Sequence, residues 1–120
     1  MGLDHVMLKV KDWHKAKEYY TSALKPLGYE PVADWGTGGG FGVPGEKTGS
    51  LFISQESQPA RAHVALAAST EQALHDYYTT AIKSGGKDNG PPGPRGHVPD
   101  GLACFVIDLD NNNVECDYRP

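Results

Sequence analysis

Two stretches of the chain repeat each other: HVMLKVKDWHKAKEYYTSALKPLG (residues 5–28) and HVALAASTEQALHDYYTTAIKSGG (residues 63–86). They align without a gap at an offset of 58 residues, so that His5 meets His63. The Tyr-Tyr-Thr run at 19–21 meets the same run at 77–79. A repeat of this length, with the same order of strand and helix signals, indicates a duplicated structural unit.

Each copy begins with a strand pattern and continues with a helix pattern. Residues 6–10 alternate between apolar and other side chains, which is typical of a half-buried strand. Asp12 is the expected N-cap of the first helix, which Gly28 ends. In the second copy Ser69 is the expected cap, with Gln72 in the capping-box position. Each unit therefore predicts a strand followed by an amphipathic helix.

Shorter strand signals separated by turns follow each helix. A long Gly/Pro-rich connection, GGKDNGPPGPRGHVPDG, precedes the last two strands and has the length of a binding loop. The prediction is an α+β fold of two tandem units, at about 1–58 and 59–120, within a single domain, each with a strand, a helix and two or three further strands. The expected later strands are 30–35, 40–43, 50–55, 102–109 and 114–119.

Composition excludes several classes of partner. The chain has 120 residues, a formal net charge of −4 and a pI near 5.6, without the basic footprint that nucleic acids or anionic membranes require. No apolar run approaches the ~18 residues of a membrane span, and no signal-peptide pattern opens the sequence. We therefore expect a cytoplasmic protein with a small-molecule ligand, in which Cys104 and Cys116 are reduced structural thiols.

Two histidines and one carboxylate share a special position in these strands. His5 and His63 lie out of phase with the apolar residues of their strands, and Glu115 lies out of phase with Val114 and Cys116. If the sheet curls so that these faces meet, they form a 2-His-1-carboxylate site for a divalent ion such as Fe, Mn, Ni, Zn or Co. Surface or hydrogen-bonded histidines are the alternative interpretation.

The motifs DHVMLKV, AHVALAA and FVIDLDNNNVECDY together resemble the vicinal oxygen chelate superfamily: glyoxalase I, bleomycin-resistance proteins and extradiol dioxygenases. The resemblance spans nearly the whole chain and implies two tandem βαβββ modules that form a curled mixed sheet around a metal-containing cleft. It places metal ligands on His5, His63 and Glu115. Glyoxalase-like members use a fourth ligand where this chain has Phe52, which cannot bind a metal, so the three-ligand pattern of the dioxygenases fits better.

This resemblance implies a metal-dependent lyase, isomerase or dioxygenase that acts on a small oxygenated metabolite by bidentate chelation. The alternative is a metal-free protein that binds and sequesters a drug, like the bleomycin-resistance proteins. Many relatives dimerise, so we expect a homodimer. The candidate residues are Glu115 and His97 for catalysis, and Trp35, Phe52 and Arg95 for the substrate cleft. For His97 the alternative is an exposed loop position, and Lys9 is either a second cation of the cleft or a solvated surface residue.

Overall fold

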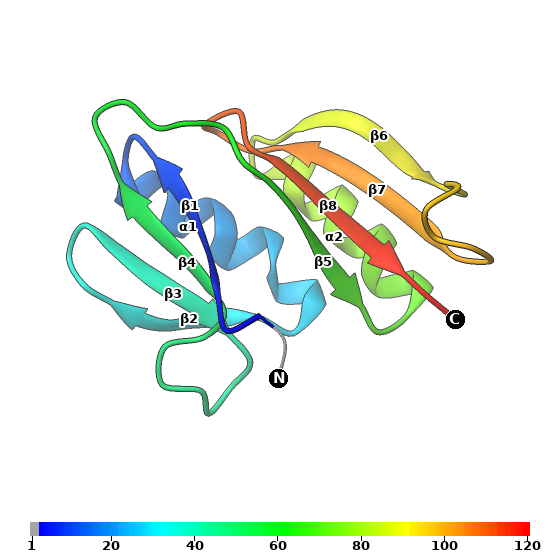
Figure 1. Ribbon diagram of the computed structural model, residues 1–120, viewed down its shortest axis with the longest axis horizontal. Helices are drawn as coiled ribbons and strands as arrows, with labels where there is room; N and C mark the ends of the chain where they lie inside the picture. Colours follow the sequence, from blue (N-terminus) through cyan, green and yellow to red (C-terminus); the bar gives the residue numbers. More distant parts are fainter. Residues whose placement is uncertain (1–2) are drawn as a thin grey trace.

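Two four-stranded sheets and two helices make up the fold (Figure 1). The structure is a computed structural model that describes residues 3–120. The first half of the chain forms β1 (Val6–Val10), α1 (Trp13–Ala23), a short 3₁₀ helix (Lys25–Leu27), β2 (Glu30–Asp34), β3 (Gly38–Gly42) and β4 (Leu51–Gln55). The second half forms β5 (His63–Ala68), α2 (Glu71–Lys83), β6 (Lys87–Gly93), β7 (Leu102–Ile107) and β8 (Asn113–Tyr118).

The two sheets have the same topology. The strand order is β1-β4-β3-β2 in the first sheet and β5-β8-β7-β6 in the second. The opening strand pairs in parallel with the last strand of its own module, and the other pairs are antiparallel. The predicted pair of βαβββ modules is thus confirmed, although the eight strands form two separate sheets.

Both helices cover the same side of the sheets and leave the other side open (Figure 1). They also pack against each other, so the molecule has one continuous core. Its largest fully buried side chains include Trp13, Tyr20, Tyr77 and Phe41. The tyrosines of the repeated Tyr-Tyr-Thr run are therefore mainly packing residues. No helix within residues 3–120 is long and apolar enough to cross a membrane.

The helix caps show one difference between sequence and structure. Asp12 caps α1 as predicted, because its side chain accepts a hydrogen bond from the Lys15 amide. Helix α2 is capped by Thr70, whose hydroxyl accepts from the Ala73 amide, and Ser69 is not the cap. Ser69 and Thr70 are both good caps, and the one-residue choice follows from where β5 ends.

The long Gly/Pro-rich connection contains a strand that the sequence pattern does not reveal. Strand β6 pairs with β7 despite its KDNGPPG sequence, and its register shifts twice, around Gly90. It is the outer strand of its sheet, where prolines and bulges are tolerated. The loop proper is therefore the segment 94–101, which carries His97.

Candidate metal centre

Glu115 is a buried carboxylate on the open side of the second sheet. Its neighbours Val114 and Cys116 are fully buried on the helix side, so the alternation of β8 turns Glu115 the other way. The residue is nonetheless only 4% exposed. A carboxylate removed from water to this degree is costly unless cations or hydrogen-bond donors surround it.

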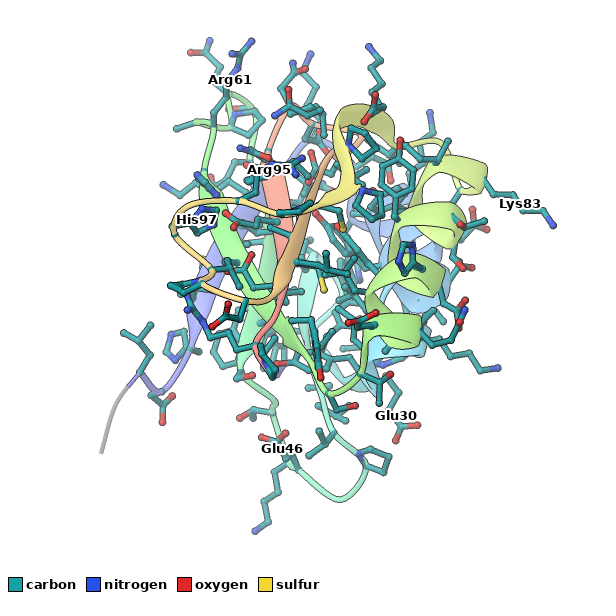
Figure 2. The ribbon with its side chains drawn as sticks, turned by 90° about the vertical axis from the view of Figure 1, so that its right-hand side faces the viewer. Glu30, Glu46, Arg61, Lys83, Arg95 and His97 are labelled. Carbon is teal, nitrogen blue, oxygen red and sulfur yellow. The ribbon has the colours of Figure 1, made fainter. Side chains whose placement is uncertain are left out.

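Two histidines contact the two oxygens of that carboxylate, one at each oxygen. Nε2 of His63 in β5 lies 2.8 Å from Oε1, and Nε2 of His97 contacts Oε2. Figure 2 shows His97 on the segment that links β6 to β7. Burial alone would raise the pKa of Glu115, but the interactions with Asp117, His97 and His63 outweigh it and hold the pKa below its usual range. Glu115 is thus an anion held between imidazoles.

Asp117 adds a second carboxylate to the same face of β8. Its Oδ1 is buried without a hydrogen-bond partner and lies 3.8 Å from Nε2 of His97. Burial, together with the nearby Glu115 charge, raises the pKa of Asp117 to about 6. His97, Glu115 and Asp117 each offer a ligand atom, and these atoms lie within 4.8 Å of one another.

Small side chains surround the two carboxylates. Ala65 stands opposite Glu115 in the register between β5 and β8, and Ala67 stands opposite Asp117. Together with Arg119 and Asp117, these alanines line a cavity of about 300 Å³. This volume is at the lower end of the range for small-molecule pockets. Room for a ligand therefore exists beside Asp117 and along the alanines of β5.

His5 lies on the other sheet, just before β1. Its Nδ1 is 2.8 Å from a carboxylate oxygen of Asp4, and its ring stacks on Phe52 at a centroid distance of 4.0 Å. Trp35 packs edge-on against the same Phe52. A cavity of about 190 Å³ between β1 and β5 is lined by both His5 and Ala65.

The predicted residues therefore fall into two groups. We call His5, Trp35 and Phe52 the first half-site. The second half-site consists of His63, His97, Glu115 and Arg95, to which the structure adds Phe105. Within residues 3–120, the contacts of Glu115 include His63 and His97, but His5 is engaged with Asp4 and Phe52 instead. Lys9 lies exposed on β1, and no ion pair to it is present in this part of the chain.

Two residues of the second half-site region were not predicted. Asp117 follows Glu115 at the strand period of two, so the spacing itself was the available signal. Phe105 faces Glu115 across the β7–β8 hairpin. Predicting that Phe105 lies beside Glu115 would have required the register of the β7–β8 hairpin. That register depends on which residues form the turn.

The donor set of this centre fits a divalent transition metal. Imidazole nitrogen and carboxylate oxygen are the ligand types that such ions prefer. The Oδ1 atom of Asp117, which has no hydrogen-bond partner, offers a further ligand atom in the group. Of the three residues expected as ligands from the sequence, His63 and Glu115 lie in contact, whereas His5 contacts Asp4 and Phe52. His97 and Asp117 stand close enough to Glu115 to orient or supplement it.

Comparison with solved structures gives the fold class. A glyoxalase/bleomycin resistance protein from Albidiferax ferrireducens T118 superposes with a TM-score of 0.82, at 24% identity and 98% coverage of both chains. The fosfomycin resistance protein FosX from Listeria monocytogenes gives 0.72 at 20% identity, covering 100% of this chain and 94% of its own. The oxidase ChaP-H2 gives 0.71 at 21% identity, with coverages of 100% and 94%. At these sequence identities the comparison shows that the proteins share a fold.

The family follows from the sequence itself. The model of the Glyoxalase/Bleomycin resistance protein/Dioxygenase superfamily matches residues 2–116. The chain belongs to this superfamily, as its motifs indicated. Among curated proteins, none matches the chain significantly.

Proposed function

We propose that the chain is a divalent-metal-dependent enzyme of this superfamily, of the lyase, isomerase or dioxygenase type, that acts on a small oxygenated metabolite. The observation that carries the proposal is Glu115, a buried carboxylate with an imidazole Nε2 at each oxygen. A packing or surface role would require neither the burial of this charge nor the convergence of two histidines on it.

In this proposal His63 and Glu115 hold the ion, and His5 is the third ligand. The bound ion would act as a Lewis acid on two neighbouring oxygens of the substrate. Three protein ligands leave coordination positions open for those oxygens. The alanines beside Glu115 provide the room for the substrate itself.

His97 is the proposed proton carrier of the site. Its ring contacts the other oxygen of Glu115 from the one His63 contacts, and half of its side chain is exposed. Nε2 of His97 can hold a proton between Glu115 and Asp117 and exchange it with a ligand in the cleft. Trp35 and Phe52 would form the apolar wall that the first half-site contributes.

We further propose a homodimer that joins the first half-site of one chain to the second half-site of its partner. Met7 and Trp35, near His5, are 47% and 53% exposed, although both are large and apolar. Such a surface favours cover by another protein surface. The single core under both sheets also resists the rearrangement that would bring His5 onto Glu115 within one chain.

Elemental analysis tests the metal site. We expect protein purified without chelators, or loaded separately with Fe(II), Mn, Ni, Zn or Co, to hold stoichiometric metal with at least one of them. Glu115→Ala should hold little, because it removes the anionic ligand. Glu18→Ala, which removes an exposed glutamate from helix α1, is the matched control and should load like the parent.

A parent protein that binds none of these metals would refute the proposal. The metal-free binding protein would then be the better interpretation, with His63 and His97 serving only to hold Glu115 in place.

A further inference from the structure

The ring of Phe105 is the common neighbour of three polar side chains in the second half-site. The His63 ring meets it at 6.3 Å and the His97 ring at 6.2 Å between centroids. The guanidinium of Arg95 lies over it at 5.6 Å. Phe105 stands directly opposite Glu115 in the hairpin, so Arg95 shares an aromatic neighbour with both histidines that contact this carboxylate.

Arg95 has no anionic partner in the part of the chain that the structure describes. Its two Nη groups donate to the carbonyl oxygens of Pro91 and Pro94, at 2.9 and 3.1 Å. No carboxylate of residues 3–120 forms an ion pair with it. Carbonyl oxygens orient a guanidinium but do not neutralise its charge. Since a guanidinium has five N–H donors, those not used here remain available to a ligand.

The backbone around Arg95 is shaped to hold it. A Cβ at Gly90 would lie 3.2 Å from Nη2 of Arg95 and 2.9 Å from the Phe105 ring. A Cβ at Gly93 would lie 3.0 Å from Nη1. Gly90 also has φ 151°, and the β6 register is irregular on both sides of it. The guanidinium therefore lies between two glycines, two carbonyl oxygens and one aromatic face.

We propose that Arg95 binds an anionic group, a carboxylate or a phosphate-type oxyanion, of the small molecule whose oxygens lie at Glu115 and His63. This inference rests on the proposed function and adds the substrate class: an oxygenated metabolite that carries a separate anionic group. A guanidinium pairs with such groups through two parallel hydrogen bonds. The carboxylates of Glu115 and Asp117 repel the same group, so the ligand has one orientation in the cleft.

The test uses two probes of similar shape, one with an anionic carboxylate and one with a neutral carboxamide in its place. 3,4-Dihydroxybenzoate and 3,4-dihydroxybenzamide share a vicinal pair of oxygens, and only the first carries an anion. Binding to the Zn(II)-loaded protein is measured by calorimetry, since zinc adds no redox chemistry. We expect the parent to prefer the benzoate by about tenfold, the size of one charge-assisted hydrogen-bonded contact.

Arg95→Gln should abolish this preference while the benzamide binds as to the parent. Arg61→Gln, which removes an exposed arginine outside both half-sites, is the matched control and should keep the preference. An equal loss of affinity for both probes in Arg95→Gln would mean that Arg95 only shapes the loop, and would overturn the inference.

A second arm separates this inference from the proposed function. Both probes are also titrated into the metal-free protein, where Arg95 should still favour the benzoate, although more weakly. A parent that loads no metal but keeps this preference refutes the metal site and leaves the assignment of Arg95. A parent that loads metal without any preference for the benzoate refutes the assignment of Arg95 alone.

Discussion

His5 is held in one orientation by two neighbours before any ligand arrives. Phe52 stacks on its ring at an interplanar angle of 15°, and Asp4 lies against Nδ1. A carboxylate at one ring nitrogen favours the tautomer with a proton there, which leaves the other nitrogen with its lone pair. Nε2 of His5 is thereby prepared to act as a metal ligand.

Asp4→Ala should therefore change the tautomer of His5. In the metal-free parent we expect neutral His5 to carry its proton mainly on Nδ1, and in the variant to shift toward Nε2. Long-range ¹H–¹⁵N NMR of the imidazole measures this directly. We also expect zinc affinity to fall about tenfold, as for other lost partners of a ligating histidine.

Asp76→Ala, on the exposed surface of α2, is the control and should change neither quantity. Identical tautomer populations in the parent and in Asp4→Ala would show that Asp4 does not orient the ring.

Strand β3 is built almost wholly of glycine, and one of these glycines lies against the first residue of α1. Its sequence is GGGFG, and each of its residues is buried. The side chain of Trp13, the first residue of α1, lies on Gly39. Trp13 is fixed there because its backbone N–H donates to Gln55 and its indole N–H donates to Asp34.

Gly39→Ala should destabilise the fold. The added Cβ would lie 2.3 Å from the Ala33 carbonyl oxygen and 2.7 Å from the Trp13 ring, and neither can move freely. We expect a loss of about 1–3 kcal/mol in the free energy of unfolding, measured by urea denaturation.

Gly96→Ala is the matched control, because nothing lies within 4 Å of a Cβ at that position. A Gly39→Ala variant as stable as Gly96→Ala would contradict this account of the β3 packing.

The elements differ in how far their sequence could reveal them. Both helices and their strands were predictable because the repeat shows the same apolar spacing twice. Strand β6 was not, since its pairing comes from the free edge of β7 and not from its own side chains. In the site, the period of two identified Glu115 and His63, whereas the positions of Phe105 and His97 depend on register and loop path.

At the scale of the molecule, a buried polar cluster joins the two modules. Asp108 accepts hydrogen bonds from the Tyr20 hydroxyl of α1 and from the side chain of Asn112. Asn112 in turn accepts from the Ala62 amide and donates to the Lys9 carbonyl. The β7–β8 turn thus contacts α1, the end of β1 and the entry to β5.

Asn112→Ala should loosen this junction. Asn112 is fully buried, and its removal leaves the Ala62 amide and part of Asp108 without partners. We expect a loss of about 2–3 kcal/mol in the free energy of unfolding. Asn89→Ala, an exposed asparagine in β6, is the control and should stay within about 0.5 kcal/mol of the parent. Equal stability of the two variants would refute a structural role for the cluster.

Mixing two variants that each bind little metal tests the proposed dimer. His5→Ala and Glu115→Ala each lose one ligand, and each alone should bind little metal. If half-sites from two chains form one centre, a mixed dimer contains one intact centre. We therefore expect metal binding to reappear after the two variants are unfolded together and refolded as a mixture.

Elemental analysis after size-exclusion chromatography measures this recovery. A mixture that binds no more metal than its separate components would show that each centre is closed within one chain.

The parallel pairing of first and last strands has a consequence for the order of folding. Val6 pairs with Leu51 and His63 pairs with Asn113, so each sheet closes only when the final strand of its module is available. Contacts this distant along the chain form late, because the intervening loop must first be ordered. Since β8 also carries Glu115, the candidate metal centre forms only at the step that completes the second sheet. Metal uptake at this centre would report finished folding and would not guide it.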